Sequence, residues 1–169
     1  MLFMKMKKYH IAGFFFVLIL GTLLHFTYNL SGQNTIVSYF SAVNESVWEH
    51  LKLIFFPALI FSMAEYFAYE NPRADFWAVK MTSIISAMCF IVIFFYTYSG
   101  VLGFNLAIID VLSFVIADFI LFYLSYNMLK SSSSGTKADS LKAVAVLLLL
   151  IVCFILWTDN PPDLGIFWG

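Results

Sequence analysis

Two carboxylates and an imidazole lie close together in the segment 44–52, which reads Asn-Glu-Ser-Val-Trp-Glu-His-Leu-Lys. Glu45, Glu49 and His50 are side chains that acid–base catalysis and divalent metal sites use. Glu45 and Glu49 share a face if the helix already includes Glu45, whereas His50 points about 100° away from Glu49. One helix face therefore cannot gather all three side chains, and a metal site here needs ligands from other segments.

Helix capping explains part of this segment without any chemistry. Ser46 and Glu49 have the spacing of a capping box, in which the Ser46 hydroxyl accepts a backbone N–H and Glu49 reaches back to the Ser46 N–H. Asn44 is an alternative cap. Capping accounts for Ser46 and one carboxylate, but it leaves Glu45 and His50 without a role.

His25 is a further candidate ligand and lies within an apolar stretch. Gly21, Thr22, His25 and Asn29 recur at three- and four-residue spacing, so they share a stripe that we expect to face protein rather than lipid. Histidines inside membrane segments are rare and are usually placed for a reason. The alternative is that His25 only bonds a neighbouring helix across a gap opened by Gly21.

Three acids in other apolar stretches could carry protons or cations. Asp110 and Asp118 fall with Ser113 and Ser125 on one polar stripe of a long helix. Glu65 is expected at a depth similar to that of Asp118, so these two acids could share a proton. The alternative is that each acid bonds to hydroxyl or backbone groups within the bundle.

The elements that position these groups follow from composition. The chain has 169 residues, of which 62% are hydrophobic, 20 are Phe and only 11% are charged, so lipid is the natural solvent. We predict an all-α integral membrane helical bundle, formed by a single domain over 1–169. Five segments are long and apolar enough to span a bilayer: 9–30, 48–69, 76–98, 101–129 and 141–157. The first span is not expected to be a cleaved signal peptide, because no small-x-small site follows it.

Lysine and arginine placement predicts the orientation in the cell membrane. With five spans, eight of these residues fall on one side and only Lys52 falls near the other. The positive-inside rule then places the N-terminus in the cytoplasm and the C-terminus outside. The eight residues are Lys5, Lys7, Lys8, Arg73, Lys80, Lys130, Lys137 and Lys142.

This orientation brings polar residues of four spans to the outer face, which is the pattern expected of an outward-facing site. They are His25, Asn29, the segment 44–52, Asp110 and residues 158–160. The candidate charge partners of Lys52 are Glu49, Asp110 and Asp159, because a buried carboxylate requires compensation.

Other features concern the connections. Trp48 is predicted to be an interfacial anchor and Pro57 to kink the second span. The segment 33–43 is too short to span and is expected to be interfacial or re-entrant. Paired prolines end the fifth span in the tail 159–169, whose aromatic residues suit the headgroup zone.

Several classes of function are excluded or weakened. The net charge of −1 gives no electrostatic footprint for a nucleic acid. Cys89 and Cys153 lie in apolar runs and are expected to be buried thiols. No internal repeat is visible, so a transporter of this size would work as a homo-oligomer.

Three segments have distinctive sequences: 44–53 with Pro57 after it, the run Gly-Thr-Leu-Leu-His-Phe-Thr-Tyr at 21–28, and Asn-Pro-Pro-Asp-Leu-Gly-Ile-Phe at 160–167. In these segments the chain resembles a family of small bacterial multi-pass membrane proteins of unknown function. The resemblance spans nearly the whole chain and implies that these three segments belong to one recurring design. The family has no assigned activity, so the resemblance implies no catalytic role.

The sequence leaves three functions open, and it does not decide whether the chain is an enzyme. The first is a membrane-embedded hydrolase or transferase on a lipid or lipid-linked substrate, with zinc as candidate metal. The second is a small ion-coupled transporter or permease subunit, and the third a non-catalytic protein that binds a small-molecule ligand or a partner. Candidate catalytic residues are Glu45, Glu49, His50 and Asp110, and candidate metal ligands are His25, Glu45, Glu49 and His50.

Overall fold

The computed structural model describes residues 2–131 and 135–168 and gives an all-helical chain, with no strand in these two ranges. The elements are α1 (Leu2–Leu30), α2 (Thr35–Ser38), α3 (Val47–Ala68), α4 (Phe76–Leu102), α5 (Ala107–Lys130), α6 (Lys137–Asp159) and the 3₁₀ helix η1 (Gly165–Phe167). Five of them, all but α2 and η1, are long and apolar enough to cross a membrane. The prediction of an all-helical chain with five such helices is confirmed.

Three helix boundaries differ from the predicted spans for local reasons. α4 continues to Leu102 and ends where Gly103 takes a left-handed conformation with φ of 78°. The fourth long helix therefore begins at Ala107 rather than at residue 101. α6 begins at Lys137, four residues before the predicted start, because Thr136 and Asp139 form a reciprocal capping box.

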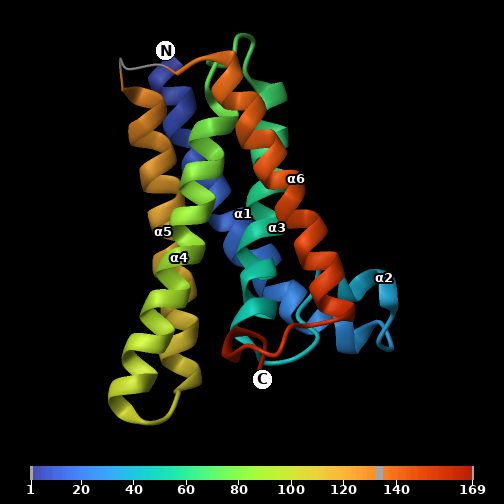
Figure 1. Cartoon of the computed structure of the whole chain (residues 1–169). Coiled ribbons are helices and arrows are strands. Elements are labelled where there is room, and N and C mark those ends of the chain that lie inside the picture. Colours follow the sequence, from blue (N-terminus) through green and yellow to red (C-terminus); the bar gives the residue numbers. More distant parts are fainter. Residues whose placement is uncertain (1, 132–134, 169) are drawn as a thin grey trace.

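The long helices alternate in direction, so their connections lie at the two opposite ends of the bundle (Figure 1). One end, which we call the loop end, carries the N-terminus and the connections α3–α4 and α5–α6. The other, which we call the motif end, carries the α1–α3 linker, the α4–α5 turn and the C-terminal tail. All residues of the segment 44–52 lie at or next to the motif end.

The helices pack as a bundle in which α1 contacts α3 and α5, and α4 contacts α3, α5 and α6. The central side chains come from every long helix and are fully or almost fully buried: Val17, Ile54, Phe55, Ile84, Ala117 and Phe154. Large apolar side chains also cover the outer faces, among them Phe15, Ile19, Ile93, Phe119 and Leu149. The outside of the bundle is therefore as apolar as its core.

The linker between α1 and α3 folds back on the end of α1. Its chain reverses at Gly32 and Gln33, which have positive φ values of 71° and 62°. The Ser41 hydroxyl donates a hydrogen bond to the carbonyl of Leu24 and accepts one from the backbone N–H of Tyr28 at 3.0 Å. These bonds hold the start of the segment 44–52 against α1.

Candidate metal centre and its cavity

Three predicted metal ligands meet at the motif end. The Nε2 atoms of His25 and His50 lie 3.2 Å apart, and an oxygen of Glu45 lies 3.5 Å from His50 Nε2 and 3.9 Å from His25 Nε2. A zinc ion bound at about 2.0–2.1 Å with tetrahedral geometry holds its ligand atoms about 3.3 Å apart. The observed triangle therefore has nearly the size of one face of a zinc tetrahedron.

The local fold frees Glu45 to join the two histidines. α3 begins at Val47, so Glu45 precedes the helix and does not share a face with Glu49. Ser46 caps the helix by accepting the backbone N–H of Glu49 at 3.3 Å. The other half of the predicted capping box is absent, because the Ser46 N–H donates to Asn44 Oδ1 at 2.9 Å instead.

A backbone carbonyl fixes the orientation of His50. His50 Nδ1 lies 2.8 Å from the Ser46 carbonyl oxygen, which can only accept, so Nδ1 carries the proton. His50 Nε2 is then left with a lone pair that points toward His25 and Glu45. Histidines that bind metals commonly donate their second ring N–H to a carbonyl in this way.

The second ring nitrogen of His25 has a different environment. Its Nδ1 atom is buried and has no hydrogen-bond partner among the described residues. The side chains of His25 and His50 are 31% and 30% exposed, and that of Glu45 is 75% exposed. The three ligand atoms are therefore accessible from outside the bundle, and a fourth coordination position would be open.

A cavity of about 450 Å³ lies beside these ligands. His25 and His50 are on its α1 and α3 walls and Glu45 is at its linker edge, whereas Asp110 is on the α5 wall. The remaining lining residues are mostly apolar: Gly21, Thr22, Phe26, Val47, Leu53, Ile91, Phe95, Asn105, Ala107, Val111, Ser113 and Phe114. Of the polar groups expected at the outer face, His25, Glu45, His50 and Asp110 line this cavity, whereas Asn29 and residues 158–160 do not.

Comparison with known families classifies the whole chain. The family of unknown function DUF6512 matches residues 1–169. The chain belongs to the DUF6512 family. No curated protein and no solved structure matches it significantly.

Tyr98 positions Asp110 in the DUF6512 chain, and sequence reasoning did not identify it. The Tyr98 hydroxyl donates to Asp110 Oδ1 and accepts the backbone N–H of Leu106 at 3.3 Å. Asp110 also lies in the first turn of α5, where a negative charge is favoured by the helix dipole. The contact spans the α4–α5 turn, and the twelve-residue separation of the two side chains gives no periodic signal in the sequence.

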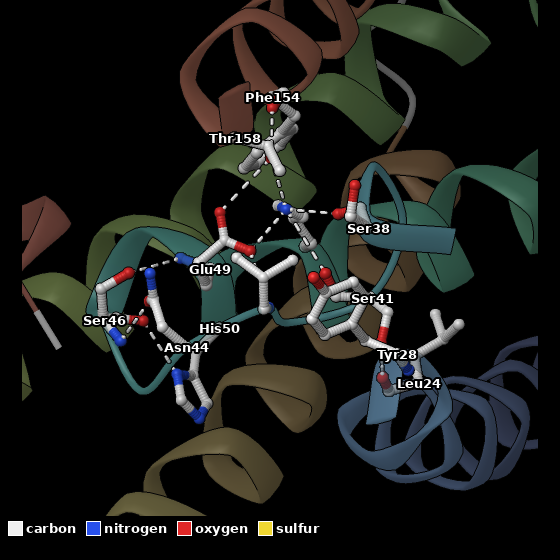
Figure 2. A network of polar contacts seen from close by, with 12 residues as sticks. Leu24, Tyr28, Ser38, Ser41, Asn44, Ser46, Glu49, His50, Phe154 and Thr158 are labelled. Atoms are coloured by element: carbon white, nitrogen blue, oxygen red, sulfur yellow. Dashed lines mark hydrogen bonds and ion pairs between the residues drawn. The ribbon is translucent and has the colours of Figure 1, made fainter. Parts of the chain in front are cut away.

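Glu49, the fourth predicted ligand, is not part of the histidine cluster. Its carboxylate is 2.5 Å from Lys52 Nζ, and both side chains are almost fully buried. Figure 2 shows the Glu49 carboxylate pointing toward Thr158 and the His50 ring pointing away from it. Of the three candidate partners of Lys52, the DUF6512 chain therefore uses Glu49.

Lys52 is the centre of a polar network between the linker, α3 and α6, and Figure 2 labels its partners Ser38, Ser41, Glu49 and Thr158. Besides Glu49, it donates to the carbonyl oxygens of Ser38 and Ser41 at 2.8 and 3.3 Å and to the Thr158 hydroxyl of α6 at 2.6 Å. The network ties the linker to α3 and α6. The polar groups of this network form hydrogen bonds with one another, so we assign the network a structural role.

Two further predicted positions lie away from the cavity lining. Asp159 accepts a hydrogen bond from the Tyr39 hydroxyl at 3.1 Å, and this bond raises the pKa of Tyr39. Trp48 is buried against Phe154 and Phe167 rather than at the surface of the bundle. The prediction that Trp48 is an interfacial anchor is therefore wrong, because the tail folds back and covers it.

A second polar cluster lies toward the loop end. Lys80 Nζ is 2.5 Å from Glu65 and 2.8 Å from the Ser125 hydroxyl, and His10 Nε2 lies 3.0 Å from the same hydroxyl. Tyr69 donates to the second Glu65 oxygen at 2.6 Å. Lys80 was counted among the eight basic residues expected on the cytoplasmic side, but its side chain is buried at 1% exposure inside the bundle. The sequence contains no motif that predicts the contacts of His10 and Lys80, because their partners are far away in sequence.

Asp118 stands apart from both clusters. It is fully buried in α5, and neither of its carboxyl oxygens has a hydrogen-bond partner among the described residues. Glu65, by contrast, is bound by Lys80 and Tyr69. The two acids therefore have different environments, and the structure shows no hydrogen bond that would let them share a proton.

Proposed function

We propose that this DUF6512 protein is a membrane-embedded, metal-dependent hydrolase or transferase that acts on a lipid-type substrate. One observation carries the proposal: His25, Glu45 and His50 place three ligand atoms within 4.8 Å of one another at the wall of a largely apolar cavity. Three protein ligands with one open position are typical of catalytic zinc sites, whereas structural zinc sites use four.

The exposed apolar surface supports a location in the bilayer. Side chains such as Phe15, Ile93 and Phe119 would be unfavourable in water but are suited to lipid. The charges support the proposed orientation. Once the buried Lys80 is set aside, seven Lys and Arg residues remain near the loop end, while Lys52 near the motif end is buried. The loop end would thus face the cytoplasm and the cavity the outside.

Each site residue has a role in the proposed chemistry. His25, His50 and Glu45 hold the metal, which supplies Lewis-acid activation of water or of a substrate oxygen. Asp110, positioned by Tyr98, acts as general base or acid from the α5 wall. The apolar part of the cavity binds the hydrocarbon portion of the substrate.

Metal analysis of the purified protein tests the proposal. The detergent-solubilised protein is equilibrated with Zn²⁺, desalted and analysed by mass spectrometry of its metal content. We expect about one zinc per chain, and a loss of at least tenfold in zinc affinity for His25→Ala and for His50→Ala. Glu70→Gln, a change at an exposed residue of the loop end, is the matched control. Wild-type protein that remains folded without binding zinc overturns the proposal.

Asp118 favours a second candidate function, movement of protons through the bundle. An acid without a partner inside an apolar interior is costly, and such groups often mark proton paths. Proton flux into liposomes distinguishes this function. If it is correct, Asp118→Asn abolishes a flux that wild-type protein shows. A wild-type flux equal to that of empty liposomes excludes proton movement as the function.

A further inference from the structure

The titratable residues of the cavity lie at one level, and the lining deeper in the bundle is mostly apolar. His25, Glu45, His50 and Asp110 are near the motif end of their helices or in the connections there. About one helical turn farther toward the loop end, the lining includes Gly21, Leu53, Ile91 and Phe114. The hydroxyls of Thr22 and Ser113 at that deeper level donate to carbonyls of their own helices. A ligand that matches this arrangement has a polar head next to the metal ligands and an apolar end that points into the bundle.

The floor of this cavity is closed by direct contact between helices. A Cβ atom at Gly21 would lie 2.4 Å from the Leu53 carbonyl and 2.7 Å from the Phe114 ring, so α1, α3 and α5 meet there. The volume of about 450 Å³ therefore suits a polar head with the first carbons of a chain. Such a pocket can hold the reacting end of an amphiphile.

The charges of the cavity are unsuited to a phosphate. Among the described residues that line it, none is Lys or Arg, while Glu45 and Asp110 are carboxylates. Asp110 has no ion pair among the described residues. The N-terminus of α5 would attract an anion by itself, but Asp110 already supplies the negative charge in its first turn. A bound divalent metal would add two positive charges, which Glu45 and Asp110 together balance. An anionic headgroup would therefore meet the Asp110 carboxylate with no excess positive charge and no basic residue to compensate.

We propose that the cavity binds acyl esters or amides whose leaving group is neutral or cationic, and that Asp110 selects against anionic headgroups. This inference rests on the proposed function. In the reaction, the oxygen of a water molecule bonds to the acyl carbon and the acyl C–O or C–N bond breaks. One proton of that water passes to the leaving oxygen or nitrogen through Asp110. The products are a fatty acid and an alcohol or amine, so no oxidant or other co-reactant is needed.

Substrates that share one scissile bond but differ in head charge test the inference. Zinc-equilibrated protein is given 1-decanoylglycerol, decanoylcholine and 1-decanoylglycerol 3-phosphate, and the release of decanoic acid is measured by mass spectrometry. We expect kcat/KM for the neutral and cationic esters to exceed that for the phosphate by at least about tenfold, because like charges in one site are strongly disfavoured.

Binding is measured separately from turnover with non-hydrolysable ethers. 1-O-decylglycerol should bind at least about tenfold more tightly than its 3-phosphate, and Asp110→Asn should reduce that ratio to about threefold or less. Asp163→Asn removes one carboxylate in the tail at the same end of the bundle, outside the cavity lining, and should leave the ratio unchanged.

The outcomes separate this inference from the proposed function. Zinc-loaded protein that binds the phosphate as tightly as the neutral ether, or whose preference is unchanged in Asp110→Asn, overturns the inference and leaves the metal site standing. Zinc-loaded protein that prefers the neutral ether but releases no decanoic acid from any ester overturns the assignment to acyl substrates. Protein that shows the charge preference but binds no zinc overturns the proposed function.

Discussion

Gly21 of α1 packs against the main-chain carbonyl of Leu53 in α3, so closely that a Cβ at Gly21 would lie 2.4 Å from that oxygen. Pro57 lies four residues after Leu53 and has no N–H to donate to the same carbonyl. The two helices can therefore approach at this point. His25 and His50 each lie about one turn nearer the motif end, so the contact brings their rings together.

Gly21→Ala should separate the two histidines. The added methyl group meets backbone rather than a flexible side chain, so α1 and α3 must move apart. We expect zinc affinity to fall at least about tenfold and thermal stability in detergent to fall as well. Gly100→Ala is the matched control, because a Cβ there meets none of the described atoms within 4 Å. Equal zinc affinity in the two variants would show that the contact does not position the ligands.

Lys52→Met should strongly destabilise the fold. It leaves the Glu49 carboxylate buried without a counter-charge, which typically costs about 3–5 kcal/mol. The double variant Glu49→Gln with Lys52→Met should recover part of that loss, since no uncompensated charge remains. Thermal or denaturant unfolding in detergent measures both. Lys142→Met is the control, because that side chain is 80% exposed and its removal should change little. A double variant less stable than Lys52→Met would contradict this account.

Asp75 should contribute stability that disappears in acid. Hydrogen bonds from Arg73 lower the pKa of Asp75 below its ordinary value of 3.8. The stabilisation is therefore complete above that ordinary value and is lost as pH falls through the lower pKa of the folded state. Asp75→Asn should be less stable than wild type at pH 6, and the difference should shrink below about pH 4. Melting temperatures over this range measure it, and a constant difference would exclude the Asp75 carboxylate as the cause.

Asp118→Leu should stabilise the protein. Both carboxyl oxygens are buried without a partner among the described residues, and an unsatisfied buried polar group costs about 1–3 kcal/mol. Ser113→Ala is a useful comparison from the same helix. The Ser113 hydroxyl donates to the Asp110 carbonyl at 2.7 Å, so its removal should not increase stability. Unfolding in detergent measures the change. A clear loss of stability in Asp118→Leu would indicate that Asp118 has a partner in solution, such as an ordered water.

The sequence predicted the helices well because each long apolar segment satisfies its own backbone within one helix. The end of α4 was not predicted correctly from the length of the apolar segment, because the helix ends at Gly103, a glycine in the left-handed conformation. His25 and His50 were recognised as candidate ligands because polar groups in apolar segments are conspicuous. The separation of Glu49 from Glu45 was one of the alternatives that the sequence left open, since it depends on α3 beginning after Ser46 and on Lys52 pairing with Glu49.

The partners of buried groups were the least predictable part. Tyr98 with Asp110 and Lys80 with Glu65 join different helices, and no spacing rule applies across a turn. Lys80 was assigned by its position near a loop, whereas its burial follows from the depth at which Glu65 lies. Tertiary packing, rather than local sequence, decides such pairs.

The polar network around Lys52 also has a consequence for how the chain is made. Thr158 is in the last long helix, so during synthesis α3 leaves the ribosome long before this partner does. Glu49 and Lys52 are only three residues apart, and they can neutralise each other within the nascent helix during that delay. Truncation before α6 would therefore leave Lys52 without Thr158 and Trp48 without Phe154, but would leave the Glu49–Lys52 pair in place.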